Sequence, residues 1–259
     1  MDAILAWLLP ADLPLWAALV LIASACLTSA MTAALGIGGG VLLLAILSML
    51  LPAAAVIPLH GLVQLGSNAN RAILTARYIR WPALYWFAPG VVLGALLASV
   101  LLIELPSWLL QLSIAGFILV LCWGPPVPQV ATRALGTFLA ATFTTFLSHF
   151  VGATGPLVAA FIKQQQQGQR QATVATFAAA MTLQHAPKIL VYSVAGFVFY
   201  EWLGLALLMI LAGVVGTKLG LKVLYASSDQ RFALVFNVLL TLLALRLIWQ
   251  ALGAYFSAG

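Results

Sequence analysis

The sequence contains little charge. Aspartate, glutamate, lysine and arginine make up 6% of the 259 residues, with 11 basic and five acidic side chains, whereas about a quarter of a soluble domain is charged. So few charges cannot cover a soluble surface of this size, and most of the exterior must therefore face lipid. Because apolar runs recur from residue 13 to residue 252, we predict an all-α, polytopic membrane protein.

Missing motifs exclude several classes of function. The chain has no phosphate-binding GxxxxGK[ST] motif, so it contains no ATP-driven motor. It has no GxSxG nucleophile elbow and no pair of intramembrane carboxylates that could hold sodium, calcium or a transition metal. Cys26 and Cys122 lie within apolar runs, where buried small side chains are expected rather than a disulfide or a metal site. We therefore expect no cofactor and no metal.

The few charges also bear on targeting and partners. Residues Met1 to Asp12 include no lysine or arginine, so they lack the basic start of a cleaved signal peptide, and the first apolar run is expected to remain. The net charge is +6, but the basic residues form no aromatic-laced face. We expect them to orient the helices in the membrane rather than to bind nucleic acid.

Ten apolar elements divide the chain. Eight are long enough, or nearly so, to span hydrocarbon. They are expected at residues 13–35, 55–77, 82–103, 106–123, 133–151, 170–193, 200–224 and 230–252. The other two, 39–51 and 155–163, are too short to span it and follow glycine-containing breaks. Short interrupted segments at matching places in two halves indicate the binding site of a transporter.

The two halves resemble each other in order. The segment Gly36 to Gly40 (GIGGG) corresponds to Gly152 to Pro156 (GATGP), 116 positions later, and Arg71 falls on Lys188 at a shift of 117. The triplet GVV occurs at residues 90–92 and again at 213–215. We therefore predict an N-terminal transmembrane repeat over residues 1–123, a proline-rich linker over 124–132 and a C-terminal repeat over 133–259.

Charge indicates how the repeats are oriented. In the first half, basic residues lie between the third and fourth elements (Arg77, Arg80). In the second half, the corresponding position between the eighth and ninth elements has none. The basic residues there lie between the seventh and eighth elements (Lys163, Arg170) and around the join of the ninth and tenth (Lys218, Lys222, Arg231). If every element crosses, all of these fall on one side, which the positive-inside rule makes cytoplasmic. The repeats are then inverted and both termini are periplasmic. In the alternative, the short elements dip in and return, and the repeats are parallel.

The glycine segments are the strongest local candidates for a binding site. Glycine permits close backbone approach and unusual torsions, and a helix N-terminus presents free N–H groups. We interpret Gly36, Gly38, Gly39 and Gly40, and in the second half Gly152, Thr154, Gly155 and Pro156, as an anion cradle. The alternative is tight helix packing, which membrane glycines commonly serve.

Polar residues within two long elements complete the candidate site. Gln64 and Arg71 lie on one helical face with Asn68 nearby, and Gln184 and Lys188 share a face of the eighth element. Buried ionisable groups in a membrane are functional candidates; the alternative for Arg71 and Lys188 is snorkelling to the membrane surface. His149 and His185 are candidates for proton coupling, with hydrogen-bonded packing as the alternative.

These motifs together resemble the sulfite exporter TauE/SafE family. The resemblance rests on the GIGGG segment, a following helix rich in Asn and Gln, the GATGP segment and QHxxK from Gln184 to Lys188, and it covers nearly the whole chain. It implies secondary transport of sulfite, thiosulfate, sulfonates or related sulfur-containing anions without a bound cofactor. Among the residues above it marks both glycine segments with Gln184, His185 and Lys188.

We therefore expect a transporter of the bacterial inner membrane, not an enzyme. A small sulfur-containing anion would bind at the midplane between the repeats, and one repeat would move against the other to give alternating access. Two other functions stay open at this point. One is a non-transporting subunit that anchors a partner protein, and the other is an intramembrane enzyme that uses His149 or His185.

Overall fold

The computed structural model describes residues 8–36, 38–101, 106–124, 133–165, 169–224 and 231–257. The described residues are helical and contain no strand. The helices are α2 (Leu15–Leu35), α3 (Gly39–Leu50), α4 (Ala53–Leu74), η1 (Ala76–Tyr78), α5 (Trp81–Tyr85), α6 (Phe87–Leu101), α7 (Ser107–Trp123), α8 (Ala134–Val151), α9 (Gly155–Gln165), α10 (Arg170–Val194), η2 (Phe199–Trp202), α11 (Leu203–Leu224) and α12 (Arg231–Ser257). Most of the expected linker, residues 125–132, lies outside the described residues.

The helices match the ten expected elements, with local differences. The third element ends as a helix at Leu74 and continues as the 3-10 turn η1. The fourth divides at Trp86 into α5 and α6, and Pro82 stands in the first turn of α5, where its missing N–H costs nothing. Pro58 and Pro187 lie inside α4 and α10, where proline weakens a helix locally. Neither proline ends its helix.

Helix length and surface chemistry confirm a multi-pass membrane protein. Among the described residues, four helical spans are long and apolar enough to cross a bilayer: Leu15–Leu35, Trp81–Leu101, Ala134–Val151 and Phe199–Val223. Large apolar side chains point outward along them, including Val100, Leu135 and Leu211. Such a surface is stable only against lipid.

The first glycine segment folds α3 back along α2. Gly36 ends α2 in the left-handed region with φ 87°, and Gly38 has φ 101°. Gly39 then packs against the backbone carbonyl of Thr28, two turns back along α2. Because α3 begins beside Thr28 and not beyond the end of α2, its 12 residues, about 18 Å long, bring the chain to Pro52. Pro52 lines a hollow together with residues 10–14, which precede α2. The short helix α3 therefore returns the chain toward the end of the molecule at which α2 begins.

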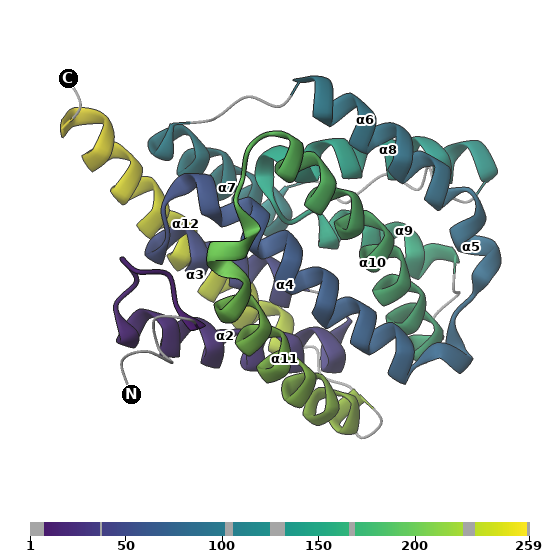
Figure 1. Ribbon diagram of the computed structural model, residues 1–259. Coiled ribbons are helices and arrows are strands. Elements are labelled where there is room, and N and C mark those ends of the chain that lie inside the picture. The colour runs from purple at the N-terminus through teal and green to yellow at the C-terminus, as the bar shows by residue number, and fades with distance from the viewer. Residues whose placement is uncertain are drawn as a thin grey trace.

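Each half packs mainly against the other half. The closest neighbours are α2 with α11, α6 with α8, α4 with α10 and α7 with α12, and Figure 1 shows α4 and α10 crossing the centre of the molecule. Suppose that the first-half helices α2, α3, α4, α6 and α7 correspond, in this order, to α8, α9, α10, α11 and α12. The pair α2–α11 then corresponds to the pair α8–α6, whereas the pairs α4–α10 and α7–α12 each correspond to themselves. A two-fold axis would give this pattern.

The two self-paired contacts are antiparallel. Gly61, early in α4, lies against Lys188, late in α10, while Arg80 beyond α4 donates its N–H to Thr176 early in α10. Likewise Trp123 at the end of α7 donates to Thr241 in α12, whereas Trp108 at the start of α7 contacts Tyr255. Corresponding helices that pack antiparallel are what an inverted repeat requires, since parallel copies would keep them parallel.

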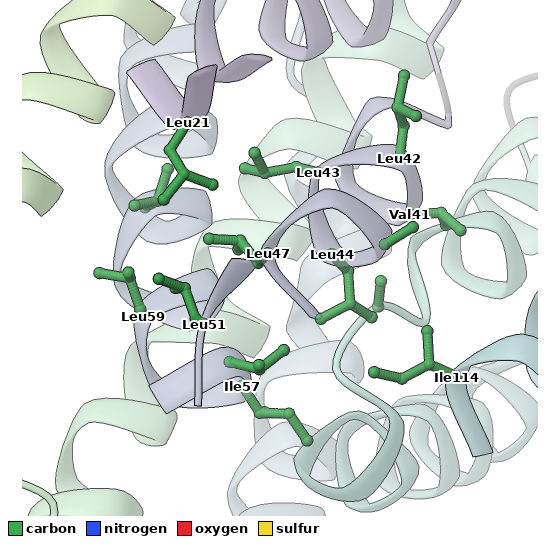
Figure 2. Close-up of a cluster of buried hydrophobic side chains, with 14 of the residues drawn as sticks. Leu21, Val41, Leu42, Leu43, Leu44, Leu47, Leu51, Ile57, Leu59 and Ile114 are labelled. Carbon is green, nitrogen blue, oxygen red and sulfur yellow. The ribbon is translucent and has the colours of Figure 1, made fainter. Parts of the chain in front are cut away.

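Two large apolar cores and a small cluster of Ala33, Val174 and Leu221 hold the described helices together. The larger is built around α3 and includes Leu43, Leu44 and Leu47 with Leu21 of α2, Leu59 of α4 and Ile114 of α7 (Figure 2). It continues into α11 and α12. The smaller joins α5 and α6 to α8, α9 and α10 around Phe87, Ile162 and Phe177. Each core thus combines helices from both halves, because α11 joins the first half's helices and α6 joins the second half's.

Charged residues separate to opposite ends of α4. Asp12 and Glu201 line one hollow together with Pro52, which precedes α4. Arg77, Arg80 and Arg170 line another hollow beyond the C-terminal end of α4. Three of the basic residues that are predicted to lie on one side of the membrane are thus found at one end of α4.

Candidate functional site

A small hollow lies where the two glycine segments meet the middle of α4 and α10. Its volume is about 20 Å³, room for about one water molecule, and it is lined by Thr32, Gly38, Gly40, Val41, His60, Gln64, Asn68, Ala153, Gly155, Pro156, Phe177, Met181 and His185. We call it the central cavity. None of these residues is acidic.

The lining reproduces the correspondence between the halves. The three α4 residues His60, Gln64 and Asn68 stand one turn apart, and the three α10 residues Phe177, Met181 and His185 are each 117 positions later. The glycine segments also supply matching positions, because Gly40 and Pro156 are 116 apart. The central cavity is therefore lined by residues at corresponding positions of the two predicted repeats.

The first glycine segment presents a helix N-terminus to the cavity. Gly38 precedes α3 and makes no side-chain capping bond, while its carbonyl accepts the N–H groups of Val41 and Leu42. A Cβ on Gly40 would lie 2.8 Å from Nε2 of Gln64, so the backbone and the α4 amide approach closely here. The positive end of the α3 dipole thus faces the cavity.

The second glycine segment is held from behind by α10. Gly152 ends α8 with φ 81°, and Lys188 donates from Nζ to the carbonyls of Ser148 at 2.7 Å and Gly152 at 2.8 Å. These carbonyls lie at the negative end of the α8 dipole, where a cation is stabilising. The Lys188 ammonium therefore fixes the turn from which α9 starts.

Two further bonds fix the start of α9. Gln184 donates from Nε2 to the Thr154 hydroxyl at 2.6 Å and to the Thr144 carbonyl at 2.9 Å. The Thr154 hydroxyl donates to the same carbonyl at 3.1 Å, and the Thr154 carbonyl accepts the N–H groups of Leu157 and Val158. Gln184 and Thr154 are thus engaged with each other and with α8, behind the cavity wall.

The α4 wall carries a chain of polar side chains. Arg71 donates from Nη1 to Oδ1 of Asn68 at 2.9 Å, and Asn68 donates from Nδ2 to Oε1 of Gln64 at 3.1 Å. One turn earlier, Nε2 of His60 lies 2.9 Å from the carbonyl of Gly40. The Arg71 guanidinium, one turn outside the cavity, therefore orients the two amides that line it.

The facing α10 wall is mostly apolar. Phe177 and Met181 occupy the positions that correspond to His60 and Gln64, and only His185 is polar. The His185 ring meets the His60 ring edge to face with their centroids 5.7 Å apart. The cavity thus has one polar wall and one apolar wall, which the sequence correspondence of the halves alone does not imply.

The structure sorts the expected site residues into two groups. Gly38, Gly40, Gln64, Asn68, Gly155, Pro156 and His185 line the central cavity. Gly36, Gly39, Arg71, Gly152, Thr154, Gln184 and Lys188 lie behind it, where they shape or hold its wall. The site selected from the sequence omits Thr32, Val41, His60, Ala153, Phe177 and Met181. His60 was recognisable, since it precedes Gln64 by one turn on the same face.

Burial argues against the alternative that the side chains of Arg71 and Lys188 extend to the membrane surface. Arg71 is 1% exposed and Lys188 0%, and both are held by contacts inside the protein, so neither snorkels to the membrane surface. His149 is also buried but lines a different hollow, together with Pro106 and Glu201 at the acidic end. Its Nδ1 lies 2.8 Å from the Thr145 carbonyl, and Tyr192 donates its hydroxyl to the His149 carbonyl.

Metal ligands do not gather in the described part of the chain, which contains no group of three histidine, cysteine, aspartate or glutamate side chains able to hold an ion. A site with helix N-termini, amides and imidazoles, and without carboxylates, suits an anion instead.

Comparison with known proteins gives one match. The family model described as sulfite exporter TauE/SafE matches residues 21–247, which include both glycine segments, α4, α10 and most of α12. No curated protein and no solved structure matches the chain. Because the match covers most of the chain, this multi-pass membrane protein belongs to the sulfite exporter TauE/SafE family.

Proposed function

We propose that the protein is a secondary transporter that exports sulfite or a related small sulfur-containing oxyanion across the bacterial inner membrane. The observation that carries the proposal is the central cavity. It is lined by residues from both halves of the chain, faces the N-terminal ends of two interrupted helices, and has no acidic side chain in its lining. Interrupted helices at the interface of repeats are where transporters bind their substrates.

Direct ligands for the anion would come from the polar wall and the glycine segments. We assign this role to the N–H groups at the starts of α3 and α9, the amide of Gln64, and His185. Asn68 would hold the Gln64 amide in place, because its Nδ2 donates to the carbonyl and to Oε1 of Gln64. The remaining predicted residues, among them Arg71, Thr154, Gln184 and Lys188, would act by positioning these groups and by contributing buried positive charge. An oxyanion needs several N–H donors but moderate net charge, because a transporter must also release it.

Alternating access would arise from the division of the fold into two cores. The larger core contains α3 and the smaller contains α9, so a movement between the cores would separate the two glycine segments. Hollows lie at both ends of α4, one lined by Arg77, Arg80 and Arg170 and the other by His149 and Glu201. An anion would collect at the basic, cytoplasmic hollow and leave through the other, and the electrochemical gradient of the anion would drive it outward.

Reconstituted vesicles test this function. Purified protein is first screened by thermal shift against sulfite, thiosulfate, isethionate, taurine and sulfoacetate, and counterflow of the labelled anion is then measured. We expect at least one of these anions to exchange faster than in empty vesicles. Gln64→Leu should reduce exchange at least tenfold, because it removes an amide from the cavity.

Gln250→Leu is the matched control. Gln250 is another membrane glutamine. Its buried amide oxygen has no partner among the described residues, and it stands in α12 away from the cavity. Exchange should stay near the wild-type rate in this variant. Equal rates in wild-type and empty vesicles for the whole panel would refute the transport function, and equal losses in both variants would refute the site.

A further inference from the structure

His60 is held in one tautomer by the first glycine segment. Its Nε2 lies 2.9 Å from the carbonyl oxygen of Gly40, and a carbonyl oxygen can only accept a hydrogen bond. Nε2 must therefore carry the hydrogen. A neutral imidazole has one N–H, so Nδ1 of His60 bears a lone pair.

That lone pair has no partner among the described residues. Nδ1 of His60 is buried without a hydrogen bond to any of them, in a ring that lines the central cavity and is itself 1% exposed. A buried polar atom left unpaired is costly, so it needs an explanation. A lone pair repels an anion, and an anion in this cavity can approach Nδ1 favourably only when a proton lies between them.

We propose that His60 binds a proton together with the transported anion, so that each anion crosses in company with one proton. This inference rests on the proposed function. A proton from the aqueous side adds to the Nδ1 lone pair and gives the imidazolium, whose new N–H donates to the anion while Nε2 keeps its bond to Gly40. On the far side the anion leaves, and the same proton returns from Nδ1 to water.

The surroundings of His60 make the two binding events interdependent. On the facing α10 are His185, in ring contact, and Lys188, whose side chain packs on Gly61. His149 of α8 lies beyond Lys188, and Arg71 stands further along α4 itself. The described part of α3 has no titratable side chain. With no carboxylate in the lining, a proton on the empty site is opposed by burial and by the two cations.

A bound anion, in contrast, favours the proton on His60. Because binding free energies are reciprocal, an anion that favours the proton on His60 must itself be bound more tightly once the proton is there. His185 also lines the cavity and has an unpartnered Nδ1, but no hydrogen bond between described residues fixes its tautomer. The hydrogen bond from Nε2 of His60 to the Gly40 carbonyl fixes the His60 tautomer. We therefore assign the added proton to Nδ1 of His60 and not to His185.

Nitrogen NMR of the intact protein tests this proposal directly. The chain has three histidines, so ring-labelled protein gives six nitrogen signals, which His149→Asn and His185→Gln assign. With saturating sulfite we expect Nδ1 of His60 to change from a lone-pair to a protonated signal, while Nε2 stays protonated throughout. A neutral His60 in the sulfite-bound protein, including one that accepts a hydrogen bond from the anion, would overturn the proposal.

Proton counting gives a second measurement. Sulfite binding is followed by calorimetry in buffers with different ionisation enthalpies, which reports the protons taken up per bound anion. Wild type should take up about one proton more than His60→Gln, a variant whose amide can still donate to Gly40. His149→Asn, which keeps a donor for Thr145, should match wild type.

The outcomes separate this inference from the function on which it rests. If wild type neither binds nor exchanges any anion of the panel, the transport function fails. If wild type exchanges sulfite but its proton count equals that of His60→Gln, transport stands and the coupling through His60 is wrong.

Discussion

Substitution of adjacent glycines separates packing from binding in the first glycine segment. A Cβ built on Gly39 would stand less than 3.0 Å from the backbone carbonyl oxygen of Thr28, a separation that real Cβ atoms essentially never show. A backbone atom cannot rotate away, so Gly39→Ala must push α3 off α2. Overpacking of this kind costs about 1–3 kcal/mol, and we expect the upper end.

Gly40→Ala meets a different neighbour. Its Cβ would lie 2.8 Å from Nε2 of Gln64, the tip of a flexible side chain that can turn aside. The added methyl also gains about 0.5–1 kcal/mol in a helix. Stability should therefore change little, while sulfite affinity falls at least tenfold because the methyl occupies the cavity and displaces a ligand amide.

Thermal unfolding in detergent, followed by sulfite binding, reads out both effects. At roughly 2–4 °C per kcal/mol for a chain of this size, Gly39→Ala should lower Tm by roughly 6–12 °C. Gly116→Ala is the control: it stands in α7 with no atom within 4 Å of its added Cβ, so it should unfold slightly above wild type and bind normally. Wild-type stability of Gly39→Ala, or normal sulfite binding by Gly40→Ala, would refute the distinction.

Two further predictions concern the second glycine segment and the membrane topology. Lys188→Met should lower stability by about 1–3 kcal/mol, since the Gly152 carbonyl loses its donor, and should reduce sulfite exchange; unchanged Tm and exchange would show that this ammonium does not hold the turn. In a variant with Cys26 and Cys122 replaced by alanine, Arg77→Cys and Lys163→Cys should both react with an impermeant maleimide only after cells are permeabilised. Reaction of just one from outside would favour parallel repeats.

Much of the architecture follows from the sequence because lipid imposes strict limits. Helices must satisfy their backbone hydrogen bonds internally, so apolar runs such as 133–151 and 170–193 predict their own boundaries to within a residue or two. The glycine segments likewise predict breaks between helices, and Gly36, Gly38 and Gly152 adopt the positive φ that such breaks require. The correspondence of Arg71 with Lys188 also emerges from residue spacing alone.

The roles of individual polar residues do not follow in the same way. Sequence spacing places Gln184 and Lys188 on one helical face, but it cannot show that both face α8 and leave the cavity to Phe177, Met181 and His185. Corresponding positions of the two halves also differ in side-chain chemistry. Gln64 and Met181 occupy corresponding positions of α4 and α10, but one contributes an amide and the other an apolar side chain to the walls that they line.

The sequence by itself determined that this chain is a membrane-embedded helical bundle with two short helices that follow glycine-containing breaks, because burial in lipid and backbone torsion are local requirements that each segment meets alone. Only the tertiary structure decided which side chains face the cavity. That choice depends on the rotation of each helix against partners from the other half, and α4 and α10 are brought together across more than a hundred residues by packing that no single segment encodes.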